Sequence, residues 1–327
     1  MTPVVDLAAA ANELRQRPRV LVACHEAPDG DALGSLVGAG LALRAGGWDV
    51  VLWAPGEAPL PADYAWLGYD EIVRTAPDDA GERLLLALDC GSAARLGSTG
   101  EAVISRAEAV INLDHHADNT RFGTINAVDS ASPCATILVL RLLRLLDLPI
   151  ALEVATALYV GIVTDTGGFM YGNTSSAAHH EAAALIDLGV QPDAIFRRLY
   201  EGKPVARTRL LARALSSLQL RLDGRLAVAS VTIADLDATG AEEADSEGTI
   251  NHLRSLAGVE VAAVVREPRA GEGRIRKVSL RSASPSIDVA AIAHTGGGGG
   301  HAMAAGFSSE ADLDAIIALI EAGMRHA

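Results

Sequence analysis

Acidic and histidine side chains recur at one kind of position in this sequence, at or just after the end of an apolar run. The side chains in this position are His25, Asp29, Asp31, Asp89, Asp114, His115, His116 and Asp165. Carboxylate oxygens suit hard divalent cations, and an imidazole among them shifts the preference from Mg²⁺ or Ca²⁺ toward Mn²⁺ or a similar transition metal. The residue types therefore indicate a metal site suited to hydrolysis of a phosphate ester.

The elements that must position these residues follow from the apolar runs themselves. Strands are expected at residues 19–24, 49–54, 84–89 and 109–114, with a helix at 31–47 between the first two. Unbroken apolar strands that alternate with helices indicate an α/β fold, a parallel sheet with helices on both faces. Ligands of such sheets bind at the carboxyl ends of the strands, which is where the acids and histidines fall.

The segment that follows the first strand is ambiguous by itself. Pro28 and Gly30 predict a tight turn rather than a helix, which would let the histidine and the acids on either side converge. An Asp-Gly turn after a strand is most often only a turn. Asp89 and the triplet at 114–116 favour the metal interpretation, because three strands then place charged side chains at one edge of the sheet.

The remainder of the chain predicts more helices and a second, smaller α/β domain. Two helices are expected within residues 134–163 and a third within 172–190. The domains are then expected at residues 1–190 and 225–327, joined by a helical linker at 191–224. 

Two segments carry their own predictions. The stretch 138–148 contains Arg141 and Arg144 and is expected to be a surface helix. The acidic stretch 234–248 is expected to be a solvated loop and helix cap.

A glycine run, Gly296 to Gly300, lies inside the second domain and ends at His301. Glycine runs are usually flexible linkers, but this one lies between an apolar helix and a strand-like segment. Without side chains, backbone N–H groups can form a concave nest around a phosphate or carboxylate. We therefore expect Gly298, Gly299 and Gly300 to contact an anion, with His301 donating to the same group.

Composition limits the possible partners and compartment. A net charge of −14 over 327 residues argues against a protein that holds long nucleic acid through its phosphates, although a short anionic substrate remains possible. Three scattered cysteines are too few for a disulfide framework, so a cytoplasmic location is expected. No apolar run approaches the roughly 18 residues of a membrane span, and the N-terminus lacks the pattern of a secretory signal.

The ordered motifs resemble those of the DHH phosphoesterases, a family named for the Asp-His-His triplet. The corresponding segments are HEAPDGDALGS at 25–35, Asp89, the triplet at 114–116, TDTGGF at 164–169, and GGGGHAMAAG at 297–306. The last segment resembles the substrate-binding domain of the DHHA1 type. The resemblance covers essentially the whole chain.

The resemblance implies a two-metal site. By that likeness, His25, Asp29 and Asp31 would hold one Mn²⁺, and Asp31, Asp89, His115 and Asp165 the other, with Asp31 shared. Mg²⁺ or Co²⁺ could substitute. Two such cations activate a water and neutralise charge on the phosphoryl group. His116 would be a catalytic group on the substrate side, and Asp114 would orient its neighbours.

The resemblance also implies substrate contacts. Arg281, flanked by Ser282 and Ser284, matches the place where the family presents an arginine to a terminal phosphate, a task that suits the bidentate guanidinium. Arg95 and Ser132 are further candidates from the first domain. Many relatives have a basic residue after the glycine-histidine pair, whereas this chain has Ala302 and Met303.

Compact two-domain members of the family hydrolyse short oligonucleotides and 3′-phosphoadenosine 5′-phosphate in the cleft between their domains, and the same function is implied here, with a homodimer as the assembly. One alternative is a phosphodiesterase of cyclic dinucleotides or their linear products. A manganese pyrophosphatase lacks the glycine-histidine module, and a RecJ-type exonuclease would bring extra basic domains. The rival from a different class is a nucleotide sensor that binds without turnover, but every ligand candidate is present.

Overall fold

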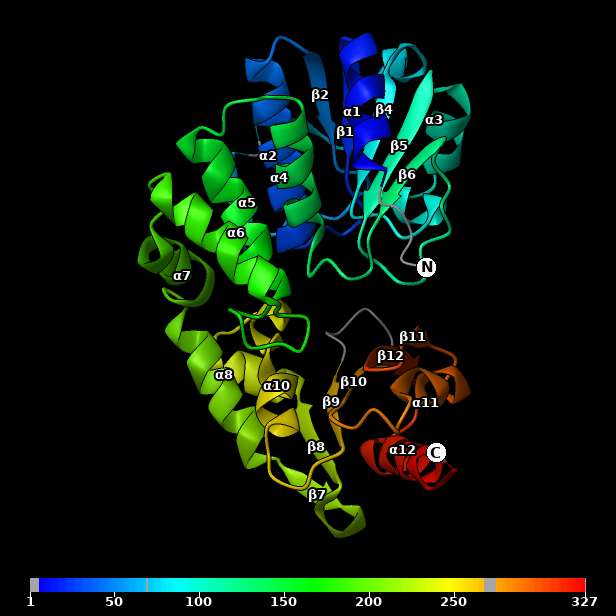
Figure 1. The fold of residues 1–327 in the computed structure, drawn as a ribbon. Coiled ribbons are helices and arrows are strands. Elements are labelled where there is room, and N and C mark those ends of the chain that lie inside the picture. The colour runs from blue at the N-terminus through cyan, green and yellow to red at the C-terminus, as the bar shows by residue number, and fades with distance from the viewer. Residues whose placement is uncertain (1–5, 69, 268–274, 327) are drawn as a thin grey trace. The chain divides into compact units, whose positions relative to one another are not determined.

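The computed structural model describes residues 6–68, 70–267 and 275–326, drawn as a ribbon in Figure 1. The chain divides into two compact units, Met1–Glu201 and Gly202–Ala327. The predicted linker is split between them, because α7 (Pro192–Tyr200) belongs to the first unit and α8 (Val205–Ser216) to the second.

The first unit contains the parallel sheet. Its strands, in spatial order, are β3 (Ile72–Val73), β2 (Asp49–Trp53), β1 (Arg19–Ala23), β4 (Leu84–Leu88), β5 (Ala109–Asp114) and β6 (Ile125–Val128). Every neighbouring pair is parallel, so the predicted fold class is confirmed. The edge strands β3 and β6 were not predicted, because neither forms a long apolar run.

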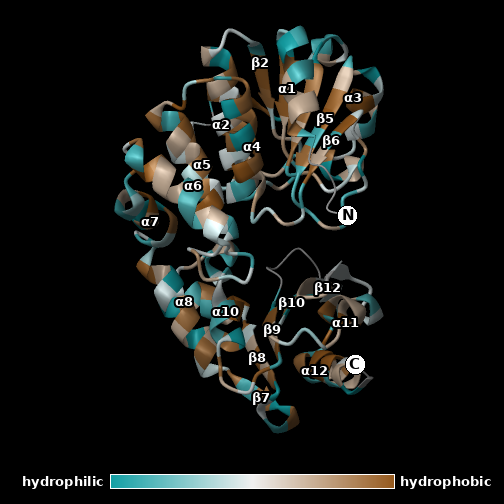
Figure 2. Ribbon diagram, in the orientation of Figure 1, coloured by the Kyte–Doolittle hydropathy of each residue, from teal (hydrophilic) through white to brown (hydrophobic). Residues whose placement is uncertain are grey.

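Helices cover both faces of this sheet. One face packs against α1 (Leu7–Gln16), α2 (Gly30–Ala45), α4 (Ala135–Leu145) and α5 (Leu152–Asp165), and the last three lie side by side in Figure 1. The other face packs against α3 (Gly100–Arg106) and short 3₁₀ turns. Val20 and Val22 face the first layer while Leu21 and Ala23 face the second. Figure 2 accordingly shows hydrophobic residues concentrated in the strands.

Helix α4 is buried, so the prediction of a surface helix at 138–148 is wrong. Nearly every residue from Ala135 to Leu143 is buried among α1, α2, α5 and the sheet. Arg141 and Arg144 instead mark the narrow outer stripe of the helix, where both approach Glu181 on α6 (Ser176–Asp187).

Glycines on α2 allow a very close approach of α5. A Cβ atom on Gly34 would lie 2.4 Å from the carbonyl oxygen of Ala157, and one on Gly30 would lie 2.4 Å from Thr164 Oγ1. Neither position can hold a larger side chain unless a helix moves, because protein interiors are close-packed. This contact brings the first turn of α2 beside the last turn of α5.

The second unit contains a mixed sheet. Its strands, in spatial order, are β11 (Gly299–His301), β12 (Ala304–Ser309), β10 (Arg276–Ser282), β9 (Val261–Arg266), β8 (Leu226–Val231) and β7 (Gln219–Arg221). Only the β8–β9 pair is parallel among these described strands. One face packs on α11 (Val289–Thr295) and α12 (Leu313–His326), and the other on α8, α9 (Ile233–Thr239) and α10 (Thr249–Arg254).

Helix α9 covers residues 234–239 of the acidic segment, so the expected loop is wrong there, although the segment does take part in a helix cap. Thr232 and Asp235 form a capping box that begins the helix, and Leu236 packs into the core. Cys24, Cys90 and Cys134 are buried and unpaired, which confirms that they form no disulfide framework. Within the described ranges, no helix is both long and apolar enough to cross a membrane.

Candidate metal centre and active site

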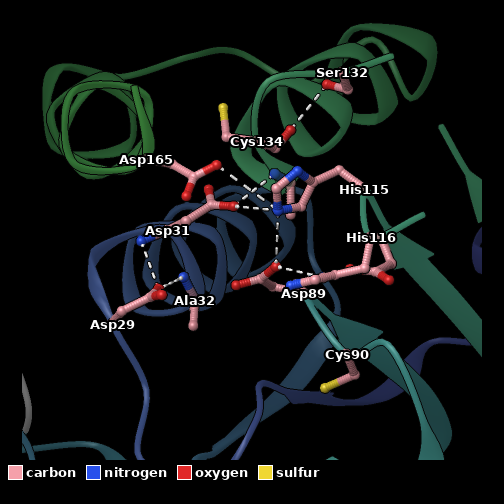
Figure 3. A network of polar contacts seen from close by, with 12 residues as sticks. Asp29, Asp31, Ala32, Asp89, Cys90, His115, His116, Ser132, Cys134 and Asp165 are labelled. Atoms are coloured by element: carbon pink, nitrogen blue, oxygen red, sulfur yellow. Dashed lines mark hydrogen bonds and ion pairs between the residues drawn. The ribbon is translucent and has the colours of Figure 1, made fainter. Parts of the chain in front are cut away.

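The predicted metal ligands gather at the carboxyl edge of the first sheet, as Figure 3 shows for most of them. They come from five segments: His25 after β1, Asp29 and Asp31 at the start of α2, Asp89 after β4, His115 after β5, and Asp165 at the end of α5. Parallel strands bring these segments together because their carboxyl ends share one edge.

The chain bends at Glu26 and Ala27, and α2 begins at Gly30, one residue before the predicted helix start. Asp29 is the N-cap residue, and its Oδ1 accepts hydrogen bonds of 3.0 Å from the N–H groups of Asp31 and Ala32. Asp31 therefore lies in the first helical turn. The aspartate cap fixes the helix start at this place, and the non-helical chain before it corresponds to the predicted turn.

Asp31 is held by the N-terminus of α4. Its Oδ2 accepts from the Ala135 N–H at 2.6 Å, and its Oδ1 accepts from the N–H and hydroxyl of Thr136 at 3.0 and 2.8 Å. A helix N-terminus favours negative charge, since its first N–H groups have no partner within the helix. The carboxylate is thus fixed in orientation before any cation binds.

Asp89 lies between two histidines. Its Oδ2 is 3.5 Å from His25 Nε2, and its Oδ1 is 3.4 Å from His115 Nε2. The residue has a φ of 56°, in the left-handed region that glycine usually occupies. Asp89 Oδ1 and Asp165 Oδ2 are buried and make no hydrogen bond within the described part of the chain. Such orphaned oxygens fit a site built for cations.

The candidate ligands form three groups, and Asp89 belongs to two of them. The groups are His25, Asp29 and Asp89; Asp89, His115 and His116; and Asp31, His115 and Asp165, and the ligand atoms of each lie within 4.8 Å of one another. His115 Nε2 lies 3.8 Å from both Asp31 Oδ2 and Asp165 Oδ2 and also approaches Asp89. The resemblance implied Asp31 at the shared position; among the described residues Asp31 belongs to one group, and Asp89 and His115 belong to two each.

In the metal-free site, several buried carboxylates lie close together and shift one another's pKa values and that of His115. Burial, together with the charges of Asp89 and Asp165, raises the pKa of Asp31 well above its ordinary value. Burial also raises the pKa of Asp165 to about 6. Burial alone would lower the pKa of His115, but Asp89, Asp31 and Asp165 outweigh it and raise this pKa to about 10. In the metal-free protein, the positive charge of protonated His115 therefore partly offsets the negative charge of these carboxylates.

His116 and Asp114 form a hydrogen-bonded pair at the edge of the cluster, where His116 Nδ1 also lies 3.6 Å from Asp89 Oδ1. His116 Nδ1 lies 2.8 Å from Asp114 Oδ1, and Asn119 Nδ2 donates to Asp114 Oδ2 at 2.5 Å. Asp114 is fully buried, while the His116 side chain is about a third exposed. The bond to Asp114 raises the pKa of His116, since a carboxylate favours the imidazolium.

The two further candidate substrate contacts in the first unit, Arg95 and Ser132, differ in how far a substrate could reach their side chains. Arg95 is exposed, and its carbonyl accepts from the Glu26 N–H at 2.7 Å, which places the residue beside His25. Ser132 is buried, and its hydroxyl donates to the Cys134 carbonyl at 2.9 Å, as drawn in Figure 3. The structure therefore gives Ser132 a role in ordering the start of α4.

The glycine run begins as a helix cap. The N–H groups of Gly297 and Gly298 donate to the carbonyls of His294 and Ala293, and Gly297 has a φ of 78°. The predicted anion nest is therefore wrong for Gly298, whose N–H is already bonded. Gly299, Gly300 and His301 form β11 against β12, and the side chain of His301 lies outside the described residues.

Arg281 lies in β10, and its Nη1 donates to the Leu280 carbonyl at 3.0 Å. It is half-buried and lies opposite Ala304 of β12.

Three residues that sequence reasoning missed hold the ligands in place. Thr136 binds Asp31, and Asn119 binds Asp114. Asn173 donates to the carbonyls of Pro133 and Asp165 at 3.1 and 3.0 Å. Their only sequence signal was a polar side chain within an apolar run or beside a ligand, which many structural residues share.

Comparisons with known proteins agree with this geometry. The description "DHH family, N-terminal domain" matches residues 19–162, and "DHHA1 domain" matches residues 223–325. The bifunctional oligoribonuclease and PAP phosphatase NrnA of Thermus thermophilus is 34% identical over 301 residues, which cover 90% of this chain and 86% of that protein. NrnA of Bacillus subtilis is 26% identical and covers 91% and 92%.

Solved structures share the fold. An exopolyphosphatase-related protein from Bacteroides fragilis has a TM-score of 0.89 at 24% identity and covers 100% of this chain and 98% of its own. RecJ of Thermus thermophilus in complex with Mn²⁺ has a TM-score of 0.56 at 18% identity and covers 98% of this chain and 54% of its own. On the family matches and the similarity to NrnA, this chain belongs to the DHH family and is an NrnA-like phosphoesterase, a hydrolase.

Proposed function

We propose that this chain is a two-metal, Mn²⁺-dependent phosphoesterase that hydrolyses short oligonucleotides to mononucleotides and dephosphorylates 3′-phosphoadenosine 5′-phosphate. The observation that carries the proposal is Asp89, a buried carboxylate that belongs to two groups of candidate ligands and has an oxygen without a hydrogen-bond partner among the described residues. The activities for which the NrnA relatives are named, oligoribonuclease and PAP phosphatase, suggest the substrate class.

Each residue has a distinct part in the proposed reaction. His25, Asp29 and Asp89 would hold one cation, and Asp31, Asp89, His115 and Asp165 the other. When bound, the two cations supply Lewis-acid polarisation of the phosphate and activation of a water. The donor set of imidazole and carboxylate is the reason for preferring Mn²⁺, with Mg²⁺ or Co²⁺ as substitutes.

The proton for the leaving oxygen would come from His116. Its Nδ1 is engaged by Asp114, which leaves Nε2 as the nitrogen available to a substrate. Asp114 favours the imidazolium form, so His116 suits the role of a general acid near neutral pH. Asp114 acts through His116 and is a positioning residue.

Substrate phosphates that are not being hydrolysed would bind arginines. Arg95 beside the metal cluster and Arg281 in the second unit are the candidates, and a guanidinium can grip a phosphate through two parallel hydrogen bonds. Gly299, Gly300 and His301 remain proposed contacts. The homodimer and the cytoplasmic location also stay predictions, the latter in keeping with three unpaired buried cysteines.

The test is product release from a short RNA, from linear and cyclic di-adenylate, and from 3′-phosphoadenosine 5′-phosphate, each with Mn²⁺ and with EDTA. We expect turnover of the short RNA, the linear dinucleotide and 3′-phosphoadenosine 5′-phosphate in Mn²⁺ only, and its loss in Asp89→Asn. Fast turnover of the cyclic dinucleotide alone would replace the proposal with a cyclic-dinucleotide phosphodiesterase. Tight nucleotide binding without turnover of any substrate would indicate a sensor.

A further inference from the structure

A polar side chain is fully buried in strand β5, beside the metal centre. Asn112 lies within the apolar run AVINLD and is as deeply buried as its neighbours. Val110 of the same strand packs into the cluster under α3, so Asn112 and Asp114 point to that face as well. Burying an amide is unfavourable unless its hydrogen-bonding groups have partners. The partners of Asn112 therefore indicate what this residue does.

Asn112 is hydrogen-bonded to a second amide. Its Oδ1 accepts from Asn119 Nδ2 at 2.8 Å, and its own Nδ2 donates to the Cys90 carbonyl at 3.0 Å. Asn119 Nδ2 also donates to the Cys90 carbonyl at 3.1 Å and to Asp114 Oδ2 at 2.5 Å, so its two protons are shared among three acceptors. We call Asn112 and Asn119 the amide pair. The amide pair thus joins the peptide that follows Asp89 to the carboxylate of Asp114.

The bonds to Cys90 act on the backbone of Asp89, which Cys90 directly follows (Figure 3). The φ of 56° at Asp89 is unfavourable for a residue with a Cβ atom, and such a conformation persists only when the surroundings determine it. The Asp89 N–H donates to the Leu113 carbonyl at 3.0 Å. The carbonyls of Cys90 and Gly91 accept from the amide pair and from the Thr120 N–H. The amide pair therefore helps to keep the Asp89 carboxylate turned toward the other candidate ligands.

The remaining bond of the amide pair fixes the partner of His116. Asp114 Oδ1 lies 2.8 Å from His116 Nδ1, and Asp114 Oδ2 accepts from Asn119. The Asn119 side chain is itself held, because its Oδ1 accepts from the Arg121 N–H at 2.6 Å. A carboxylate bonded at both oxygens cannot rotate without losing one of these bonds. The direction of the His116 ring is thus set through Asp114 and Asn119.

We propose that Asn112 and Asn119 are positioning residues of this active site. The amide pair holds the Asp89 carboxylate in place for cations. Through Asp114, it also holds His116 in the orientation that delivers a proton to the leaving oxygen. This second task rests on the proposed function, whereas the first concerns metal binding alone. One pair of amides thus connects a metal ligand to the proton donor.

The test separates the two tasks by the leaving group. Hydrolysis of linear di-adenylate releases a ribose oxygen, which must be protonated, whereas the p-nitrophenyl ester of adenosine 5′-phosphate releases a phenolate, which is stable without a proton. In Asn112→Leu and Asn119→Ala we would measure kcat and KM on both substrates at saturating Mn²⁺. We would also measure Mn²⁺ affinity by calorimetric titration of the metal-free protein, and the midpoint of its thermal unfolding.

The matched control is Asn126→Leu. Asn126 of β6 lies opposite Asn112 in the strand register. Among the described residues, its side chain bonds only the backbone of Gly123, at 3.0 Å and 2.7 Å. The control therefore removes an amide of the same kind from the same sheet without touching a candidate ligand.

We expect Asn112→Leu and Asn119→Ala to weaken Mn²⁺ binding by about 3- to 10-fold, because the Cys90 carbonyl loses one of its two side-chain donors. Asn119→Ala should also lower kcat on linear di-adenylate by about 10- to 100-fold, and kcat on the p-nitrophenyl ester by less than about threefold, with both KM values unchanged. Asn126→Leu should keep the Mn²⁺ affinity of the wild-type protein and its ratio of the two kcat values.

Wild-type Mn²⁺ affinity in both variants, or a wild-type kcat ratio in Asn119→Ala, would overturn the proposal, and so would equal changes in Asn126→Leu. If Asn112→Leu does not fold, Asn119→Ala, in the loop after β5, decides between these outcomes. If the wild-type protein hydrolyses neither substrate, the proposed function fails, and the Mn²⁺ titrations still test the hold on Asp89.

Discussion

Replacing Thr136 by valine removes one hydroxyl from the metal centre and keeps the shape of the side chain. Thr136 is fully buried, and its hydroxyl donates to Asp31 Oδ1 at 2.8 Å. In Thr136→Val a methyl group faces the carboxylate instead. The ionised form of Asp31 then rises in free energy, and a proton competes better with a cation for it.

The size of the effect follows from the lost bond. A hydrogen bond to a charged group is worth about 1.5–3 kcal/mol, and about 1.36 kcal/mol corresponds to a factor of ten. We therefore expect Mn²⁺ affinity at the group containing Asp31 to fall by about 10- to 160-fold. The Mn²⁺ affinity of the group of His25, Asp29 and Asp89 should fall less, because Thr136 contacts none of its members.

Calorimetric titration of the metal-free protein with Mn²⁺ would measure both affinities. Thr136→Ser is the matched control, since it keeps the donor and loses only the methyl group that packs toward Gly161. The reasoning would be refuted if valine left both Mn²⁺ affinities intact, or if serine weakened binding as much as valine did.

Three other perturbations have defined outcomes. Gly34→Ala would place a Cβ atom 2.4 Å from a backbone carbonyl of α5 and should destabilise the protein by about 1–3 kcal/mol in thermal unfolding, whereas Gly172→Ala, with open space around it, should not. Asp114→Asn should lower kcat by about 10²- to 10⁴-fold and shift the pH profile of kcat, because the His116 imidazole loses its carboxylate partner, while Mn²⁺ binding persists. An equal loss of kcat in Asp118→Asn, at an exposed position, would contradict this reasoning. His115, with a pKa of about 10, holds in the folded metal-free protein a proton that the unfolded chain loses near about pH 6.5, so the free energy of unfolding should fall as the pH rises from 7 toward 10. A melting temperature unchanged by pH in the metal-free protein would show that this proton is absent.

The sequence predicted where the ligands lie better than it predicted which ligands share a cation and which residues hold them by hydrogen bonds. Acids after apolar strands indicated one sheet edge, because strand ends of a parallel sheet must meet there. The sharing of Asp89 depends on the distances between β1, β4 and β5, which residue types do not encode. Thr136 reaches Asp31 across 105 residues of chain, so only the folded structure reveals the bond.

Local patterns failed where tertiary contacts decided the outcome. Arg141 and Arg144 suggested a surface helix, yet only one stripe of α4 reaches Glu181 and the rest is buried. The glycine run suggested a phosphate nest, yet Gly297 and Gly298 complete the cap of α11. In both segments the same residue types are compatible with two different structures. Contacts with residues distant in sequence determine which of the two forms.

The bond between Asp31 and α4 has a consequence for the synthesis of the chain. Asp31 emerges from the ribosome well before Ala135 and Thr136, which orient it, and Asp165 emerges later still. A nascent chain that ends at β5 therefore carries most of the ligands but cannot assemble the centre. Because a ligand that binds only the folded state stabilises that state alone, a cation would stabilise the finished unit and give little help to its folding intermediates.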